Sequence, residues 1–207
     1  MTNRWGTGRA EAFSDGVFAI AITLLVLDLN VPESDLDELW RGILHQWPSY
    51  LGYVTSFAAI GGIWLGHHGI FRRLRYVNEH VMRLNLVLLM AVSFLPFPTR
   101  LVAETIGNDD AERVAVVFYG LSLLAIALAI GALWTAVLAD RELLRPEVTD
   151  GEVRAITRAA TPNIAAYVVG IAVAFVFPTA AAFAYLLIAL ASILRAPGDS
   201  RRAAEPA

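Results

Sequence analysis

The residues best suited to chemistry in this chain of 207 residues lie in two short stretches. The first, RAEAFSDGVFAIAITLLVL at positions 9–27, places the carboxylate of Asp15 where a polar opening meets an unbroken apolar segment. The second holds the adjacent pair His67 and His68, with Trp64 one helical turn before His68. An ionisable group at the mouth of a membrane helix is costly, and it commonly belongs to an ion path or to a network that locks helices together. In the simpler alternative, the short polar side chains at this point only cap the helix.

These residues do not match the sequence motifs of an enzyme or of a metal site. Ser14 and Asp15 have no positioned histidine in their own segment, and the sequence has no G-x-S-x-G, H-E-x-x-H or glycine-rich phosphate loop. The absence of cysteine excludes thiolate catalysis and cysteine-based zinc sites. On a helix His67 and His68 point about 100° apart, so they do not naturally chelate one metal. We therefore predict no enzyme activity, no metal and no cofactor.

The composition predicts a membrane protein. Hydrophobic residues make up 57% of the chain and charged residues 17%, which is more apolar surface than one soluble domain of this size could hide. The net charge of -3 argues against a nucleic-acid partner. We predict an all-α membrane protein with one transmembrane domain over residues 1–195 and a disordered cytoplasmic tail over residues 196–207. The six predicted transmembrane helices span about residues 12–30, 48–71, 83–103, 113–138, 160–177 and 179–195.

The arginines test this topology independently of hydropathy. With six spans, thirteen arginines share one side with both termini, and only Arg41, Arg100 and Arg113 lie on the other side. Because positive charge accumulates on the cytoplasmic side, both termini are predicted to be cytoplasmic. The last two segments are short and separated only by Phe177-Pro178-Thr179, so they could instead form one broken or re-entrant pair. Five spans would leave the C-terminal arginines outside, so their distribution favours six.

The first predicted helix has two different faces. At about 100° per residue, Ile20, Leu24 and Leu27 follow one stripe, and Thr23 lies on its flank. Such a stripe faces lipid, a neighbouring helix or the symmetry axis of an oligomer. Ser14 and Asp15 fall well off the stripe and should point into protein.

Asp15 needs a partner from another segment, because an unpaired carboxylate at this depth is expensive. Arg9 lies six positions away on a different face, so a salt bridge within the helix is not expected. Trp64 could join the network through its indole N–H. The candidate partners at the end of the second predicted helix are His67, His68, Arg72 and Arg73.

Arg9, Phe13, Ser14 and Asp15 form the pattern R-x-x-x-F-S-D. This pattern, with the GVFAIAITLLVLDL that follows it, resembles the opening of the first helix in the endosomal and lysosomal transmembrane potassium channel family. The segment WLGHHGIF at residues 64–71 is also similar to that family. The pattern occurs once, so the chain resembles the single-repeat prokaryotic branch, and the resemblance implies a homotetramer in the plasma membrane of a prokaryote.

The resemblance also implies that four copies of the first helix line a central potassium pathway without a T-V-G-Y-G filter. By its position after the pattern, Ile20 matches the hydrophobic constriction and Thr23 the residue linked with selectivity, while Leu24 and Leu27 match further pore-facing layers. The expected function is a channel with modest selectivity for potassium over sodium. The residues expected to hold the helices together behind the pore are Arg9, Phe13, Ser14, Asp15, Trp64, His67 and His68.

Two other classes of protein remain open from the sequence. A proton-coupled secondary transporter could use Asp15, His67 and His68 as a proton relay, although the interrupted segments do not pair convincingly as repeats. A structural or signalling membrane protein would conduct no ions at all.

Overall fold

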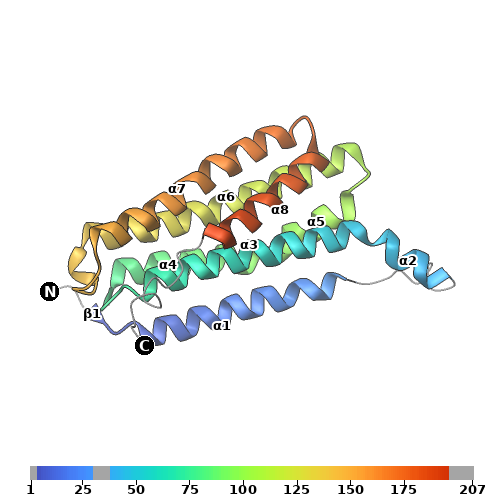
Figure 1. Ribbon diagram of the computed structural model, residues 1–207. Coiled ribbons are helices and arrows are strands. Elements are labelled where there is room, and N and C mark those ends of the chain that lie inside the picture. The colour runs from blue at the N-terminus through green and yellow to red at the C-terminus, as the bar shows by residue number, and fades with distance from the viewer. Residues whose placement is uncertain (1–3, 30–37, 196–207) are drawn as a thin grey trace, which may run out of the picture.

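The computed structural model describes residues 4–29 and 38–195, apart from the side chains of residues 159–162. Long helices lie side by side along one axis and form an elongated bundle (Figure 1). The helices of this bundle are α1 (Gly8–Leu24), α2 (Leu39–His45), α3 (Trp47–Phe71), α4 (Glu79–Phe94), α5 (Pro96–Thr105), α6 (Asp109–Ala139), α7 (Asp150–Ala174) and α8 (Pro178–Arg195). The predicted tail over residues 196–207 lies outside the described residues.

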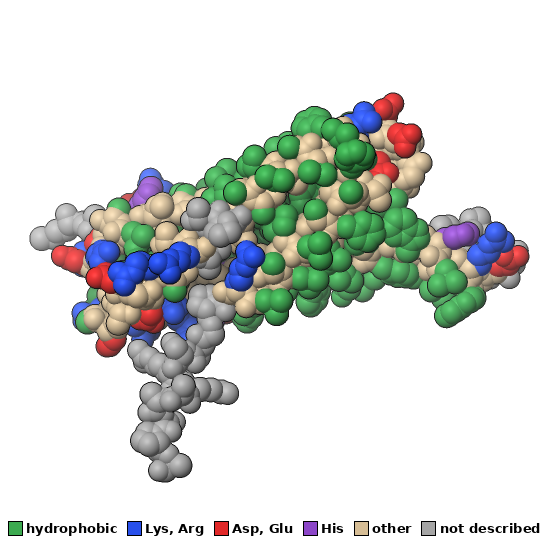
Figure 2. Space-filling model, turned by 45° about the horizontal axis from the view of Figure 1, so that its top comes forward, with side chains coloured by type: hydrophobic (Ala, Val, Ile, Leu, Met, Phe, Trp, Pro, Cys, Tyr) green, Lys and Arg blue, Asp and Glu red, His purple; other side chains and the backbone are tan. Residues whose placement is uncertain are grey.

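The surface of the bundle suits a membrane. Charged side chains gather at its two ends, and a long hydrophobic surface separates them (Figure 2). By length and composition, five segments could cross a membrane: Gly8–Asp28, Glu79–Thr105, Asp109–Ala139, Asp150–Ala174 and Pro178–Arg195.

Helix α3 was also expected to span the membrane, and it is not among those five segments. It has 25 residues, which is long enough, but its sequence contains five glycines and the two histidines. Helix α3 packs against α1, α5, α6 and α8, so neighbouring helices cover much of its surface. A helix in that position needs less apolar side-chain surface than a helix surrounded by lipid.

Helix α1 begins and ends earlier in the chain than the first predicted helix, which covers residues 12–30. Helix α1 begins at Gly8, because Arg9 and Glu11 are good helix formers although they are not apolar. It ends at Leu24 and tightens into a short 3-10 helix over Leu25–Asp28. The predicted end at residue 30 lies outside the described residues.

The difference is larger for the fifth predicted helix, which covers residues 160–177 and corresponds to α7. Helix α7 begins ten residues earlier, at Asp150, and ends at Ala174. Its start is fixed by a capping box, in which Thr149 accepts from the backbone N–H of Glu152 while Glu152 accepts from that of Thr149. Because the first turns of α7 are charged, a search for apolar segments does not find this start.

Prolines divide the remaining helices. Helix α4 ends at Phe94 and α5 begins at Pro96, so the third predicted helix is divided into two helices at its first proline. Helices α7 and α8 are separate neighbours that run in opposite directions, with Pro178 at the start of α8 (Figure 1). They are two long helices rather than one broken pair.

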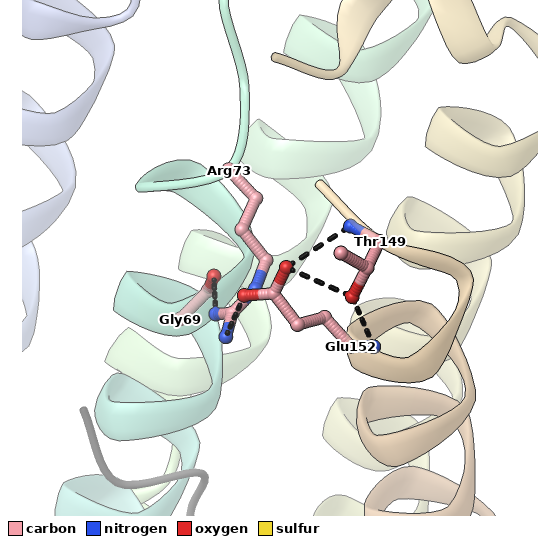
Figure 3. A network of polar contacts seen from close by, with 4 residues as sticks. All are labelled: Gly69, Arg73, Thr149 and Glu152. Atoms are coloured by element: carbon pink, nitrogen blue, oxygen red, sulfur yellow. Dashed lines mark hydrogen bonds and ion pairs between the residues drawn. The ribbon is translucent and has the colours of Figure 1, made fainter. Parts of the chain in front are cut away.

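One end of the bundle is closed by short backbone pairings. Strand β1 (Arg4–Trp5) pairs antiparallel with β2 (Val77–Asn78), between α3 and α4. Nearby, Arg73 donates to the carbonyl of Gly69 at 2.7 Å and meets the carboxylate of Glu152 at 3.4 Å, which joins the end of α3 to the start of α7 (Figure 3). We call this end of the molecule, where Arg4 and Arg73 lie, the arginine-rich end.

Candidate functional site

Helix α1 lies at the edge of the bundle, where α3 and α4 are its main neighbours (Figure 1). The side chains that it buries are spaced by three or four positions and therefore share one face. These residues are Ala10, Ser14, Phe18 and Ala21, and the face continues at Leu25 in the 3-10 helix.

A different face of α1, which Leu27 continues in the 3-10 helix, is apolar and open. Ile20 is 61% exposed, Leu24 41% and Leu27 71%, so the described residues of one chain leave much of the predicted stripe uncovered. Thr23 is also exposed, and its hydroxyl donates to the backbone carbonyl of Ile20 at 2.9 Å. That bond leaves the lone pairs of the Thr23 oxygen available to a ligand on the exposed side.

Asp15 meets Trp64 of α3. The indole Nε1–H of Trp64 donates to Oδ1 of Asp15 at 2.8 Å, and the indole stacks on the ring of His68 at 5.7 Å. Of the residues considered as partners for Asp15, His67 bonds to Asn85 of α4, and Arg73 bonds to Gly69 and Glu152. Trp64 therefore holds the carboxylate directly and does not only extend its network.

A second set of polar contacts runs through the buried face of α1. The hydroxyl of Ser14 donates to the carbonyl of Ala10 at 2.7 Å, so its oxygen accepts from Nδ2 of Asn85 in α4 at 3.0 Å. The remaining oxygen of the Asn85 amide lies 2.9 Å from Nε2 of His67 in α3. Because that oxygen can only accept, Nε2 of His67 carries the proton in this contact.

This network is buried and enclosed by aromatic rings. Ser14 is 0% exposed, and Asn85 and His67 are each 1% exposed. The ring of His67 stacks on Phe71 at 4.2 Å and lies 5.4 Å from the ring of Phe18 in α1. Three helices therefore share one polar cluster at the level of the R-x-x-x-F-S-D pattern.

Asn85 is not among the residues that the sequence predicts for this network. The signal that could have found it is a lone amide inside an otherwise apolar predicted helix, because a polar side chain at such a position needs a partner. Two other residues of the predicted network lie outside the cluster, since Arg9 is exposed and Phe13 is 58% exposed on the open side of α1.

The arrangement assigns two kinds of chemistry to α1. Its buried face supplies hydrogen bonds that fix the rotation and height of the helix against α3 and α4. Its open face offers branched apolar side chains and one hydroxyl to whatever lies alongside it.

Known proteins share this chain's sequence and fold. The family described as endosomal/lysosomal potassium channel TMEM175 matches residues 9–96. A protein of Streptomyces collinus that is named a potassium channel is 41% identical over 202 residues, which cover 97% of this chain and 98% of that relative. A mouse protein named endosomal/lysosomal proton channel TMEM175 is 36% identical over 159 residues, which are 69% of this chain and 31% of the mouse protein.

A solved structure has the same architecture. The crystal structure of a lysosomal potassium-selective channel TMEM175 homolog from Chamaesiphon minutus superposes with a TM-score of 0.83 at 40% identity. The match covers 93% of this chain and 98% of that one. By its sequence and its helical channel fold, this chain belongs to the TMEM175 family.

Proposed function

We propose that this protein is a potassium channel of a prokaryotic cell membrane, in which α1 from each of four copies lines a central pore. The observation that carries the proposal is the contrast between the two faces of α1. One face is held by α3 and α4, while Ile20, Leu24 and Leu27 form an apolar stripe that is open in a single chain. One such stripe cannot enclose a pore, so the proposal requires several copies.

The constriction is proposed at Ile20. A ring of branched apolar side chains excludes water when it is narrow, so the pore closes by dewetting and opens when α1 rotates or moves outward slightly. A rotation of α1 also changes the contacts on its buried face. The Asp15–Trp64 and Ser14–Asn85 bonds therefore help to set the width of the Ile20 ring.

Selectivity for potassium would arise from partial dehydration at that ring. Sodium holds its water more tightly than potassium, so a narrow apolar passage favours potassium modestly. Thr23 lies one turn further along the open face, and its oxygen can accept a hydrogen bond from a water molecule that accompanies the ion. An arrangement of this kind replaces the carbonyl filter of ordinary potassium channels.

The test is ion flux into liposomes that contain the purified protein. The proposal predicts potassium flux that exceeds sodium flux, and Ile20→Asn should increase the flux of both ions and reduce the difference between them, because an amide ring keeps the constriction wet. Leu187→Asn is the matched control, since Leu187 is 66% exposed on α8, a helix that packs against α3, α6 and α7. Equal effects of the two substitutions, or an absence of flux in the wild type, would contradict the proposal.

A proton-coupled transporter is the competing function, and the geometry does not favour it. Among the described residues, no hydrogen bond joins Asp15 to either His67 or His68. His67 is 1% exposed and lies against Asn85 and the ring of Phe71. Because the mouse relative is named a proton channel, proton flux is measured in the same liposomes. Single-channel current steps would exclude a transporter.

A further inference from the structure

A cavity lies on the side of α3 away from α1, between α3, α6, α7 and α8. It has a volume of about 100 Å³. It is partly open to the surface, and most of its lining is apolar. Its walls include Gly62, Gly66, Leu123, Ile130, Trp134 and Tyr167.

Small residues and a short helix create this space. Gly62 and Gly66 have no side chain, and a Cβ added to them would lie 3.2 Å from Ser192 and 3.4 Å from Ile130. Helix α8 has 18 residues against 25 in α7, and it stops part way along the bundle, short of the arginine-rich end (Figure 1). The part of α3 and α7 beyond the end of α8 is therefore left without that cover.

Two of the polar side chains that line the cavity are paired within the fold, and Asn163 and Tyr167 also line it. The indole N–H of Trp134 donates to Thr157 at 3.0 Å, and the hydroxyl of Ser192 donates to the carbonyl of Ile188 at 2.7 Å. Most of the other lining residues are glycine, alanine, isoleucine or leucine, so the walls are mainly hydrocarbon and suit a chain of methylene groups.

A guanidinium group lies at the rim. Arg195, the last residue of α8, lines the cavity and is exposed, and it makes no hydrogen bond or ion pair with any described residue. Gly69 also lines the cavity, and its carbonyl holds Arg73, which places a second guanidinium near the same end (Figure 3). An arginine beside apolar walls in a membrane protein matches the phosphate of a phospholipid in charge and geometry.

We propose that this cavity and Arg195 form a binding site for an anionic phospholipid from the leaflet at the arginine-rich end. One acyl chain enters between α3, α6 and α8, and the phosphate accepts hydrogen bonds from Arg195. The residues that follow Arg195 read APGDSRRAAEPA, with no large apolar side chain, so this segment is a poor occupant for hydrocarbon walls. The site lies on the opposite side of α3 from α1, and it does not depend on the proposed pore.

The first test uses a trace of phosphatidylglycerol with a photoreactive acyl chain, in liposomes that contain the full-length protein. After illumination, mass spectrometry locates the labelled peptides. The proposal predicts labelling concentrated in residues 59–70 of α3 and 123–134 of α6. Labelling spread over the exposed surface of all helices would overturn it, as would no label in these two segments, the result expected if water or a second copy of the chain fills the space.

Two pairs of variants separate the acyl-chain contact from the phosphate contact. Ala127 lines the cavity and Ala125 is exposed on the same helix, so Ala127→Phe should reduce labelling of the two segments to the level of the general surface, while Ala125→Phe should not. Arg195→Gln should reduce labelling about fivefold, whereas Arg158→Gln, an exposed arginine of α7, should leave it within about twofold. Equal labelling within either pair would overturn the proposal. The readout is independent of ion flux, so this test can fail while the channel proposal stands.

Discussion

Asn85 offers the sharpest test of how α1 is held, because its side chain bonds to both Ser14 of α1 and His67 of α3. Replacing it with alanine removes one hydrogen bond to each partner. Hydrogen bonds between membrane helices contribute about 0.6 kcal/mol on average and at most about 1.7. The buried N–H of His67 also loses its acceptor, which costs about 1–3 kcal/mol. We expect Asn85→Ala to lower the free energy of unfolding by about 2–4 kcal/mol.

The assay is unfolding of the purified protein in mixed micelles, followed by circular dichroism as the fraction of denaturing detergent rises. A double-mutant cycle with Ser14→Ala isolates the bond between Ser14 and Asn85, and a coupling energy of about 0.5–1.5 kcal/mol is expected. Thr135→Ala is the control, because the exposed hydroxyl of Thr135 bonds only within its own helix, to the carbonyl of Ala132. Its effect should stay below about 0.5 kcal/mol.

The reasoning fails if Asn85→Ala is as stable as the control variant. It also fails if the losses from Ser14→Ala and Asn85→Ala simply add, since additive losses mean that the two side chains do not interact. Either result would remove the buried polar cluster from the account of how α1 is oriented.

Three further predictions follow from single contacts. Thr23→Ala should weaken the preference for potassium in a reversal-potential measurement with potassium on one side and sodium on the other, and an unchanged potential would remove Thr23 from the selectivity argument. Asp15→Ala should lower the melting temperature of the assembled protein more than Asp15→Asn, which keeps an acceptor for the Trp64 indole, and a normal assembly with altered conductance would instead place Asp15 in the ion path. Gly120→Ala should destabilise the fold by about 1–3 kcal/mol, because a Cβ there would lie 2.1 Å from the hydroxyl oxygen of Tyr185 in α8. Gly61→Ala is the control, because a Cβ at Gly61 meets nothing within 4 Å. Equal stability of the two variants would contradict this packing.

The parts of the structure that the sequence predicts well are those governed by local periodicity. Ile20 and Ser14 fall on different faces of α1, one exposed and one buried, because the period of a helix is the same wherever it packs. The break before Pro96 follows from the chemistry of proline in the same way.

The parts that the sequence predicts poorly depend on what lies next to a helix. Helix α7 begins at Asp150, where charged residues favour a capped helix and a search for apolar segments finds nothing. Asn85 and the choice of Trp64 as the partner of Asp15 depend on how α1, α3 and α4 are rotated against one another. Hydropathy and spacing within one segment carry no information on that rotation.

The central claim is that the open face of α1 lines the ion pathway, and the absence of cysteine in the natural chain permits a direct measurement. Single cysteines are placed at Leu24 and Leu27 on the open face, at Ala21 on the buried face, and at Met90, which is 67% exposed on α4. Cadmium is then added while potassium current is recorded. The account predicts block of the Leu24→Cys and Leu27→Cys channels and no block of Ala21→Cys or Met90→Cys. Block through Met90→Cys together with insensitive Leu24→Cys and Leu27→Cys channels would place the pathway elsewhere and contradict the account.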